Sequence, residues 1–309
     1  MDKIIEVRGL NKSYGSFKAV ESLDLDVYRG DVFGFLGPNG AGKSTTIRML
    51  VSLIKPTEGI IKIFNEDLST HRNSILRRVG CIVEKPDFYN YLSAKKNLEL
   101  LSNLNGLTLK KNKISELLEF VGLKSRGDDL VKTYSHGMKQ RLGLAQALIH
   151  DPELIILDEP TTGLDPQGII DIRNLILFLS KEQKKTIFLS SHILSELELI
   201  ANRLAIINKG KTVAQGELKS ILHDNDRVVT IKTDKIEEAI IAINNSIWKA
   251  QFKERNEEGL TFQLHLDQIP LLNIFLIENG FSVYAIESRR QLEDFFLKLT
   301  ESTEKMQIH

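Results

Sequence analysis

The chain has 309 residues, of which 42% are hydrophobic and 27% charged, a balance typical of a globular protein with a sizeable core. Basic and acidic residues number 41 each, which argues against a nucleic-acid footprint and against strong attraction to an anionic membrane. The single cysteine, Cys81, has no partner for an internal disulfide, as fits a reducing compartment. No apolar run approaches the roughly 20 residues that cross a bilayer, and the start of the chain lacks a signal-peptide core, so we expect another chain to supply any membrane span.

The first part of the chain predicts strands that lead to one strongly apolar run. Residues 4–7 read as a strand and residues 11–20 as a turn and a second strand. Residues 23–27 alternate apolar and polar side chains, and a turn then leads into the apolar run Val32–Leu36. Tyr14 precedes this run. Its ring either stacks on an adenine base or packs at the sheet edge, and spacing alone leaves both interpretations open.

Residues 37–45 read GPNGAGKST and fit the phosphate-loop pattern GxxxxGK[ST] at every fixed position. Glycines let backbone N–H groups converge on phosphates, and the start of a following helix adds positive potential. Lys43 is expected to span the β- and γ-phosphates, and the Ser44 hydroxyl is a hard oxygen ligand suited to Mg²⁺. The apolar strand before the loop and the helix-compatible sequence after it disfavour an ordinary glycine-rich turn. We therefore predict a nucleotide site here.

A mainly helical segment separates this loop from the next informative stretch. Residues 79–83 predict a strand that ends at Glu84, and Lys85-Pro86 breaks it. From residue 92 to residue 149 the periodicity is helical, interrupted by short glycine-containing breaks. We interpret this region as a helical subdomain inserted into an α/β core.

Two carboxylates follow the apolar strand Leu154–Leu157. In a phosphate-loop protein, a carboxylate at the tip of such a strand usually completes the Mg²⁺ shell, which suits Asp158. The next one, Glu159, is placed to orient or deprotonate the attacking water. A solvated strand end is the alternative, and four preceding apolar residues make it a poor explanation.

A second strand, predicted at residues 186–189, leads into Ser190-Ser191-His192 and a helix. A lone histidine after a strand is more often structural than catalytic, but the carboxyl end of a strand in a phosphate-loop protein makes His192 a candidate. Residues 204–214 predict a hairpin that closes this part of the chain.

These residues carry a family resemblance. GPNGAGKST resembles the Walker A motif of ATP-binding-cassette (ABC) transporter ATPases, YSHGMKQ (residues 134–140) their signature segment and LIILDEP their Walker B motif. GLDP resembles their D-loop, and Ser191-His192 their switch histidine. The five motifs occur in the family's order across roughly residues 3–215. The ordered set also argues against a small-molecule kinase that shares only the phosphate loop.

The resemblance implies an α/β phosphate-loop ATPase core with an antiparallel β subdomain and a helical subdomain at about residues 86–150, within an ABC nucleotide-binding domain of residues 1–220. It implies ATP and Mg²⁺ as cofactors. It also implies two cassettes packed head to tail, expected to be a homodimer, with each ATP between the Walker A of one chain and the signature segment of the other.

The same resemblance assigns the site residues. Catalytic roles are implied for Glu159 and His192, and metal binding for Ser44, Glu84 and Asp158. Contacts to the partner's ATP, or coupling between the two sites, are implied for Ser135, Gly137 and Asp165. The implied ATP-binding residues are Tyr14, Gly37, Pro38, Asn39, Gly40, Ala41, Gly42, Lys43, Ser44, Thr45 and Thr46.

Two departures from the family pattern stand out. The signature is usually LSGGQ-like, but His136 occupies its third position, where we expect spacing and surface, or pH sensitivity. Glu84 stands where the family usually carries a glutamine that touches Mg²⁺ and links to the membrane partner. With the Pro-Asp-Phe-Tyr run of residues 86–89, Glu84 resembles the bacterial export ATPases that protect cells from lantibiotics and bacitracin-like peptides.

The expected function is therefore that of an ATP-hydrolysing motor that powers a separate membrane permease. Its substrate would be a peptide antibiotic, a drug or another amphiphile, and export would give resistance or immunity; an ion or a lipid stays open as an alternative. We expect the chain in the cytoplasm, peripheral at the inner face of the cell membrane. The rival hypothesis is a soluble cassette ATPase acting on ribosomes or DNA, which the absence of a second cassette and of a basic surface disfavours.

Residues 226–309 predict a small C-terminal α+β domain. Strands are expected at residues 227–232, 248–255, 260–266 and 281–286, and helices at residues 235–244, 268–278 and 290–299. The order βαββαβ indicates a ferredoxin-like layer, which we expect to serve dimer contact or regulation. Its last helix would dock on the cassette or a second subunit, or simply pack in the core, through Leu292, Phe295, Phe296 and Leu299.

Overall fold

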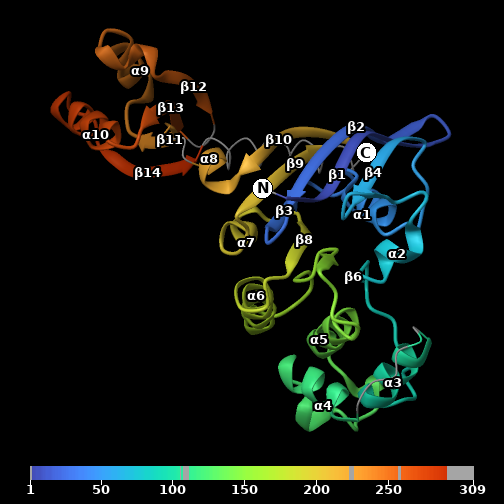
Figure 1. Cartoon of the computed structure of the whole chain (residues 1–309). Helices are drawn as coiled ribbons and strands as arrows, with labels where there is room; N and C mark the ends of the chain where they lie inside the picture. The colour runs from blue at the N-terminus through green and yellow to red at the C-terminus, as the bar shows by residue number, and fades with distance from the viewer. Residues whose placement is uncertain (1, 105, 107–110, 223–225, 257–258, 291–309) are drawn as a thin grey trace. The chain divides into compact units, whose positions relative to one another are not determined.

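The computed structural model describes residues 2–104, 106, 111–222, 226–256 and 259–290. The chain divides into two compact units, Met1–Leu218 and Lys219–His309, which are called unit 1 and unit 2 below. Figure 1 shows their elements. No helix in the described part of the chain has the length and apolar character needed to span a membrane.

Unit 1 begins with an antiparallel sheet of four strands in the order β2-β1-β4-β5. The strands are β1 (Lys3–Tyr14), β2 (Phe17–Tyr28), β4 (Glu58–Ile63) and β5 (Glu66–Asp67). The sequence predicted a turn and a second strand within residues 11–20, and a turn at residues 15–16 does separate β1 from β2, but both strands are longer than expected and the strand expected at residues 23–27 is part of β2. Four register shifts in the β1–β2 pair absorb the polar residues that suggested a break, because bulges bend a strand without ending it.

A second sheet of six strands has the order β10-β9-β3-β8-β7-β6. The strands are β3 (Val32–Leu36), β6 (Val79–Ile82), β7 (Leu154–Leu157), β8 (Thr186–Ser191), β9 (Arg203–Asn208) and β10 (Lys211–Glu217). All pairs are parallel except the β9–β10 hairpin. Because β3, β7 and β8 run in parallel, the segments that follow them emerge at one edge of the sheet. This edge carries the phosphate loop, the two carboxylates and the candidate histidine.

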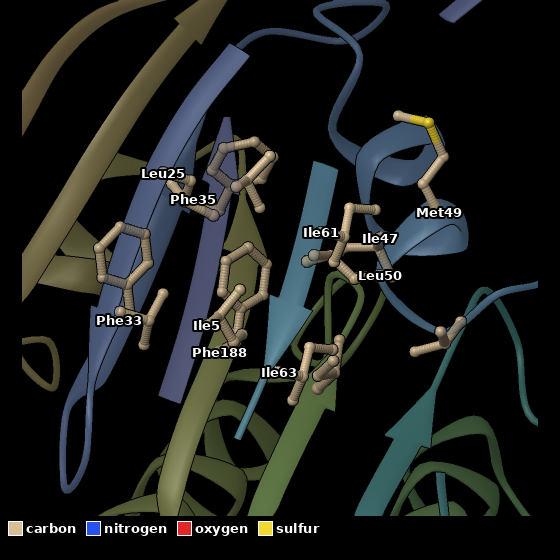
Figure 2. Close-up of a cluster of buried hydrophobic side chains, with 14 of the residues drawn as sticks. Ile5, Leu25, Phe33, Phe35, Ile47, Met49, Leu50, Ile61, Ile63 and Phe188 are labelled. Atoms are coloured by element: carbon tan, nitrogen blue, oxygen red, sulfur yellow. The ribbon is translucent and has the colours of Figure 1, made fainter. Parts of the chain in front are cut away.

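The main core of unit 1 joins both sheets to helix α1 (Lys43–Leu50). Figure 2 shows its apolar side chains from β1, β2, β3, β4, β8 and α1 packed together. Phe33 and Phe188 stack with ring centroids 5.6 Å apart, and both are fully buried. The second half of the helix that follows the phosphate loop, through Ile47, Met49 and Leu50, is therefore fixed by apolar packing.

The remaining helices of unit 1 lie partly within residues 92–149, the region that the sequence predicted to be helical. They are α2 (Arg72–Leu76), α3 (Ala94–Leu104), α4 (Lys111–Phe120), α5 (His136–Ala147), α6 (Pro166–Lys181) and α7 (Leu194–Glu198), with 3₁₀ turns η1 (Lys124–Arg126) and η2 (Val131–Thr133). Helix α5 was expected near Met138 but begins at His136. Ser135 caps it by accepting a hydrogen bond from the Met138 N–H.

The described part of unit 2 contains β11 (Asp226–Thr233), α9 (Ile236–Asn244), η3 (Ile247–Ala250), β12 (Phe252–Asn256), β13 (Gly259–His265), α10 (Gln268–Glu278) and β14 (Val283–Arg290). Helix α8 (Leu218–Leu222) precedes them. The antiparallel sheet order β12-β13-β11-β14 is that of a ferredoxin-like βαββαβ layer, which confirms the expected fold.

Two details of unit 2 differ from expectation. Trp248 was placed in a strand but lies in η3, where its side chain is buried in the core of unit 2. The helix expected from residue 290 does not begin there, because Arg290 ends β14. The four apolar residues assigned to that helix, at positions 292, 295, 296 and 299, lie outside the described residues.

Candidate nucleotide-binding site

The phosphate loop leaves the carboxyl end of β3 and is held tightly by its neighbours. The Gly37 N–H donates to the Ser191 carbonyl over 3.2 Å, which ties the loop to the end of β8. A Cβ at Gly37 would lie 2.5 Å from the Ile207 carbonyl oxygen. Gly42, with a φ of 104°, has the same constraint, because a Cβ there would lie 2.6 Å from the Ala19 carbonyl oxygen. Glycine is therefore required at both positions.

A cavity of about 240 Å³ opens over this loop. Its lining comes from β2, the loop, α1 and the end of β7: Phe17, Ala19, Asn39, Gly40, Gly42, Lys43, Ser44, Thr45 and Glu159. Six of these are predicted ATP-binding residues.

The other predicted ATP-binding residues do not line the cavity. Ala41 and Thr46 are buried, and the Thr46 hydroxyl donates to the Gly42 carbonyl over 2.9 Å, so both stabilise the loop. Tyr14 is 49% exposed and stacks with the Lys12 ammonium 5.0 Å from its ring centroid.

Phe17 is the aromatic residue that lines the cavity, and sequence reasoning missed it. It pairs with Tyr14 across the β1–β2 hairpin. Two aromatic residues three positions apart around a Tyr-Gly turn were the signal that could have identified it.

The Lys43 ammonium has a complete set of partners inside the cavity. Its Nζ lies 2.7 Å from the Gly37 carbonyl oxygen, 3.2 Å from that of Pro38 and 3.1 Å from Glu159 Oε1. The Lys43 side chain is only 5% exposed. An ammonium has three N–H donors, so these three oxygens use all of them.

Glu159 is the centre of a second set of contacts. Thr162 Oγ1 donates to Glu159 Oε2 over 2.8 Å, and His192 Nδ1 lies 2.9 Å from the same oxygen. Burial raises the pKa of Glu159, but the Thr162 hydrogen bond and the charge of Lys43 outweigh burial, so the pKa lies below its ordinary value. The carboxylate is therefore ionised at neutral pH. Its backbone has a φ of 48°, in the left-handed region that side chains rarely adopt.

The three predicted metal ligands, Asp158, Ser44 and Glu84, differ in their burial and in their position relative to the cavity. Asp158 is buried, and its Oδ1 accepts from Ser190 Oγ over 2.7 Å. Ser44 lines the cavity, whereas Glu84 does not; it is more than half exposed and pairs with Arg48 of α1. No group of three or more acidic, histidine or cysteine residues in the described chain is placed to hold a metal. Mg²⁺ binds through one or two protein oxygens, waters and phosphates, so Ser44 and Asp158 still suit it.

The signature segment lies at the start of α5 and contacts the loop after Glu159. Ser135 caps α5, and Asp165 caps α6 by accepting from the Gly168 N–H over 3.0 Å. Ser135, Gly137 and Asp165 do not line the cavity of their own chain. His136 Nε2 lies 3.2 Å from the Thr162 carbonyl oxygen.

Comparison with known proteins gives a consistent result. The family described as "ABC transporter" matches residues 20–162. The bacitracin transport ATP-binding protein BcrA of Bacillus licheniformis is 45% identical over 97% of this chain and 98% of its own length. The Nod factor export ATP-binding protein I of Cupriavidus metallidurans is 36% identical over 97% of this chain and 98% of its own.

A solved structure extends the likeness to the fold. A dimeric, post-hydrolysis ATP-binding cassette, MJ0796 bound to ADP and Pi, has a TM-score of 0.63 and 25% identity. It covers 69% of this chain and 98% of its own. The expected family resemblance and fold class are confirmed.

Proposed function

The chain belongs to the ATP-binding proteins of ABC transporters, and from this premise we propose that it drives export of a peptide antibiotic or a similar amphiphile through a separate membrane permease. It is an ATPase whose hydrolysis of ATP is coupled to transport. The observation that supports our assignment of roles is the contact network of Lys43, Glu159 and His192 at the phosphate loop.

ATP binding would exchange the partners of Lys43. The phosphates would occupy the cavity lined by residues 39–45, and the Lys43 ammonium would leave Glu159 for the β- and γ-phosphates. Glu159, ionised and freed of Lys43, would orient the attacking water as a general base. His192 would hold the other carboxylate oxygen and reach the γ-phosphate.

Mg²⁺ would be held by Ser44 and by Asp158, which Ser190 orients, and it supplies positive charge that offsets the charge of the phosphates. Glu84 would join this shell only after its pair with Arg48 opens. We therefore expect Glu84→Gln to leave ATP affinity within about twofold but to change stimulation of ATPase by the permease. Unchanged stimulation and unchanged protection of cells would contradict a specialised role for Glu84.

A second copy of this chain would complete each site. Ser135 and Gly137 at the start of α5 lie away from their own cavity and would contact the partner's γ-phosphate, while Asp165 would couple the two sites. The dimeric state of the similar cassette supports the pairing of two copies. Such a dimer would work at the inner face of the membrane, against its permease.

The choice of substrate follows from the relatives. The bacitracin relative is more similar than the Nod factor relative over the same share of the chain, 45% against 36% identity. We therefore expect the chain, co-expressed with its permease in sensitive cells, to raise the inhibitory concentration of bacitracin-type peptides several-fold. Glu159→Gln should abolish that protection. No protection against such peptides from a transporter with normal ATPase activity would refute the substrate but not the motor.

The permease itself can be identified by affinity purification of the tagged Glu159→Gln chain with ATP from its native cells in mild detergent. A stoichiometric membrane protein with several spans is the expected result. Recovery of ribosomes or nucleic-acid-binding proteins without any membrane chain would contradict transport.

Unit 2 would serve dimer contact or regulation, as an accessory domain of residues 226–309. Its separate core supports an independent module. Unchanged dimerisation, ATPase rate and protection after removal of residues 226–309 would contradict this role.

A further inference from the structure

His136 occupies the third position of the signature segment, where it departs from the LSGGQ-like family pattern, and its ring has a defined contact. Its Nε2 lies 3.2 Å from the Thr162 carbonyl oxygen. A carbonyl oxygen only accepts hydrogen bonds, so Nε2 must carry the proton and donate. The ring also lies against Gly163, where a Cβ would stand 3.5 Å from His136 Nε2 and Cδ2. The contact thus joins α5 to the loop between β7 and α6.

The loop that His136 contacts holds Glu159 from the other side. The Thr162 N–H donates to the Glu159 carbonyl over 3.2 Å, and Thr162 Oγ1 donates to Glu159 Oε2 over 2.8 Å. Thr162 is therefore fixed at its carbonyl by His136 while its backbone N–H and its hydroxyl fix Glu159. Glu159 needs such support, because its left-handed backbone is strained.

We propose that His136 is a positioning residue for ATP hydrolysis, which anchors Thr162 and so holds the Glu159 carboxylate in its working orientation. The link runs from the signature segment, which would meet the partner's nucleotide, to the carboxylate of its own chain. The orientation of Glu159 in one cassette would thereby depend on whether ATP is bound at the partner's phosphate loop. This inference rests on the role proposed above for Glu159 and on the proposed dimer.

Because His136 acts through Thr162, its removal should affect turnover rather than binding. We expect His136→Leu to lower kcat for ATP about three- to tenfold, the range for loss of one hydrogen bond of about 1 kcal/mol. KM for ATP should stay within about twofold. His136→Gln should keep kcat within about twofold of the wild type, because a glutamine amide N–H can reach the same carbonyl. The Hill coefficient for ATP should fall toward 1 in the leucine variant only.

The measurement is steady-state ATPase activity of the purified full-length chain over a range of ATP concentrations. His71→Leu is the matched control, since His71 lies on the surface of unit 1 and pairs with Thr70. Thr162→Val tests the link from its other end. It should lower kcat by a similar factor, and the double variant with His136→Leu should be no slower than the slower single variant.

Three results would overturn the inference. They are wild-type kcat for His136→Leu, equal slowing by leucine and glutamine, or a raised KM at unchanged kcat, which would mean direct contact with ATP. If thermal melting shows that His136→Leu is unfolded, His136→Phe, which keeps a ring of similar size but has no N–H donor, decides by the same kcat and KM measurements. Near-wild-type turnover of Glu159→Gln would refute the role of Glu159 itself; an inactive Glu159→Gln with a normal His136→Leu would refute only the positioning role.

Discussion

Replacing Glu159 by glutamine removes one negative charge from the cavity and keeps the side-chain volume. Glu159 Oε1 lies 3.1 Å from Lys43 Nζ, and the two side chains are 22% and 5% exposed. A hydrogen bond to a charged group stabilises by about 1.5–3 kcal/mol, and the bond from the charged Lys43 ammonium moves from the upper part of this range with a carboxylate acceptor to the lower part with a neutral amide acceptor, so the substitution weakens the hold on Lys43 by about 1 kcal/mol. Since ATP must displace this contact, Glu159→Gln should bind ATP about fivefold more tightly.

Two measurements on the same variant check this reasoning. Titration calorimetry with Mg²⁺ and a non-hydrolysable ATP analogue gives the affinity of both chains under equal conditions, and an ATPase assay should show nearly complete loss of turnover. Glu196→Gln is the matched control, because its carboxylate accepts from the Thr161 hydroxyl rather than from Lys43. Equal or weaker affinity in Glu159→Gln would show that the ion pair does not compete with nucleotide. Near-normal turnover would remove Glu159 from the chemistry.

Three further substitutions test the packing and the charges of the fold. Gly80→Ala would put a Cβ 2.1 Å from the Ala147 carbonyl oxygen, so thermal unfolding should show a loss of about 3 kcal/mol; an unchanged melting temperature would contradict the packing of β6 on α5. The Arg78 hydrogen bond lowers the pKa of Glu153, so its stabilisation is present above the ordinary carboxyl pKa and is lost as the pH falls through the lowered one. Since both groups are more than a third exposed, Glu153→Gln should cost only about 0.5 kcal/mol at pH 7 and progressively less as the pH falls through the lowered pKa, and a pH-independent difference would refute this. Phe262→Ala in the core of unit 2 should cost that unit about 3–5 kcal/mol, and a calorimetric scan in which unit 1 melted lower as well would show that the units are not independent.

Apolar runs and the periodicity of apolar residues were enough to predict strands and helices whose apolar residues are buried. The limits of Leu154–Leu157 and Gln268–Glu278 agree with the expectation at both ends. The full lengths of β1 and β2 were missed because register shifts, which depend on the partner strand, carry each strand past its polar residues. Trp248 was missed because burial of an aromatic ring against a core suits a 3₁₀ turn as well as a strand.

For the site as well, local sequence predicted some features, whereas contacts between distant residues could not be predicted. Motif spacing predicted that the loop, the carboxylates and His192 would meet at one sheet edge, because that depends only on parallel strands ending together. Spacing did not reveal that Phe17 rather than Tyr14 lines the cavity, or that Glu84 pairs with Arg48. Both depend on side-chain directions across neighbouring elements. The contact of His136 with Thr162 is of the same kind, since it joins residues that are 26 positions apart.

The position of β3 in its sheet has a consequence for synthesis of the chain. Its five residues are all buried, and it lies between β8 and β9, whose first residues are Thr186 and Arg203. The ribosome must therefore add about 150 residues after β3 before its first partner strand exists. At about 5–20 residues per second this takes roughly 8–30 seconds. During that time the apolar strand that carries the phosphate loop lacks its partner strands, and the nucleotide site, although encoded near the start of the chain, is among the last parts of unit 1 to be completed.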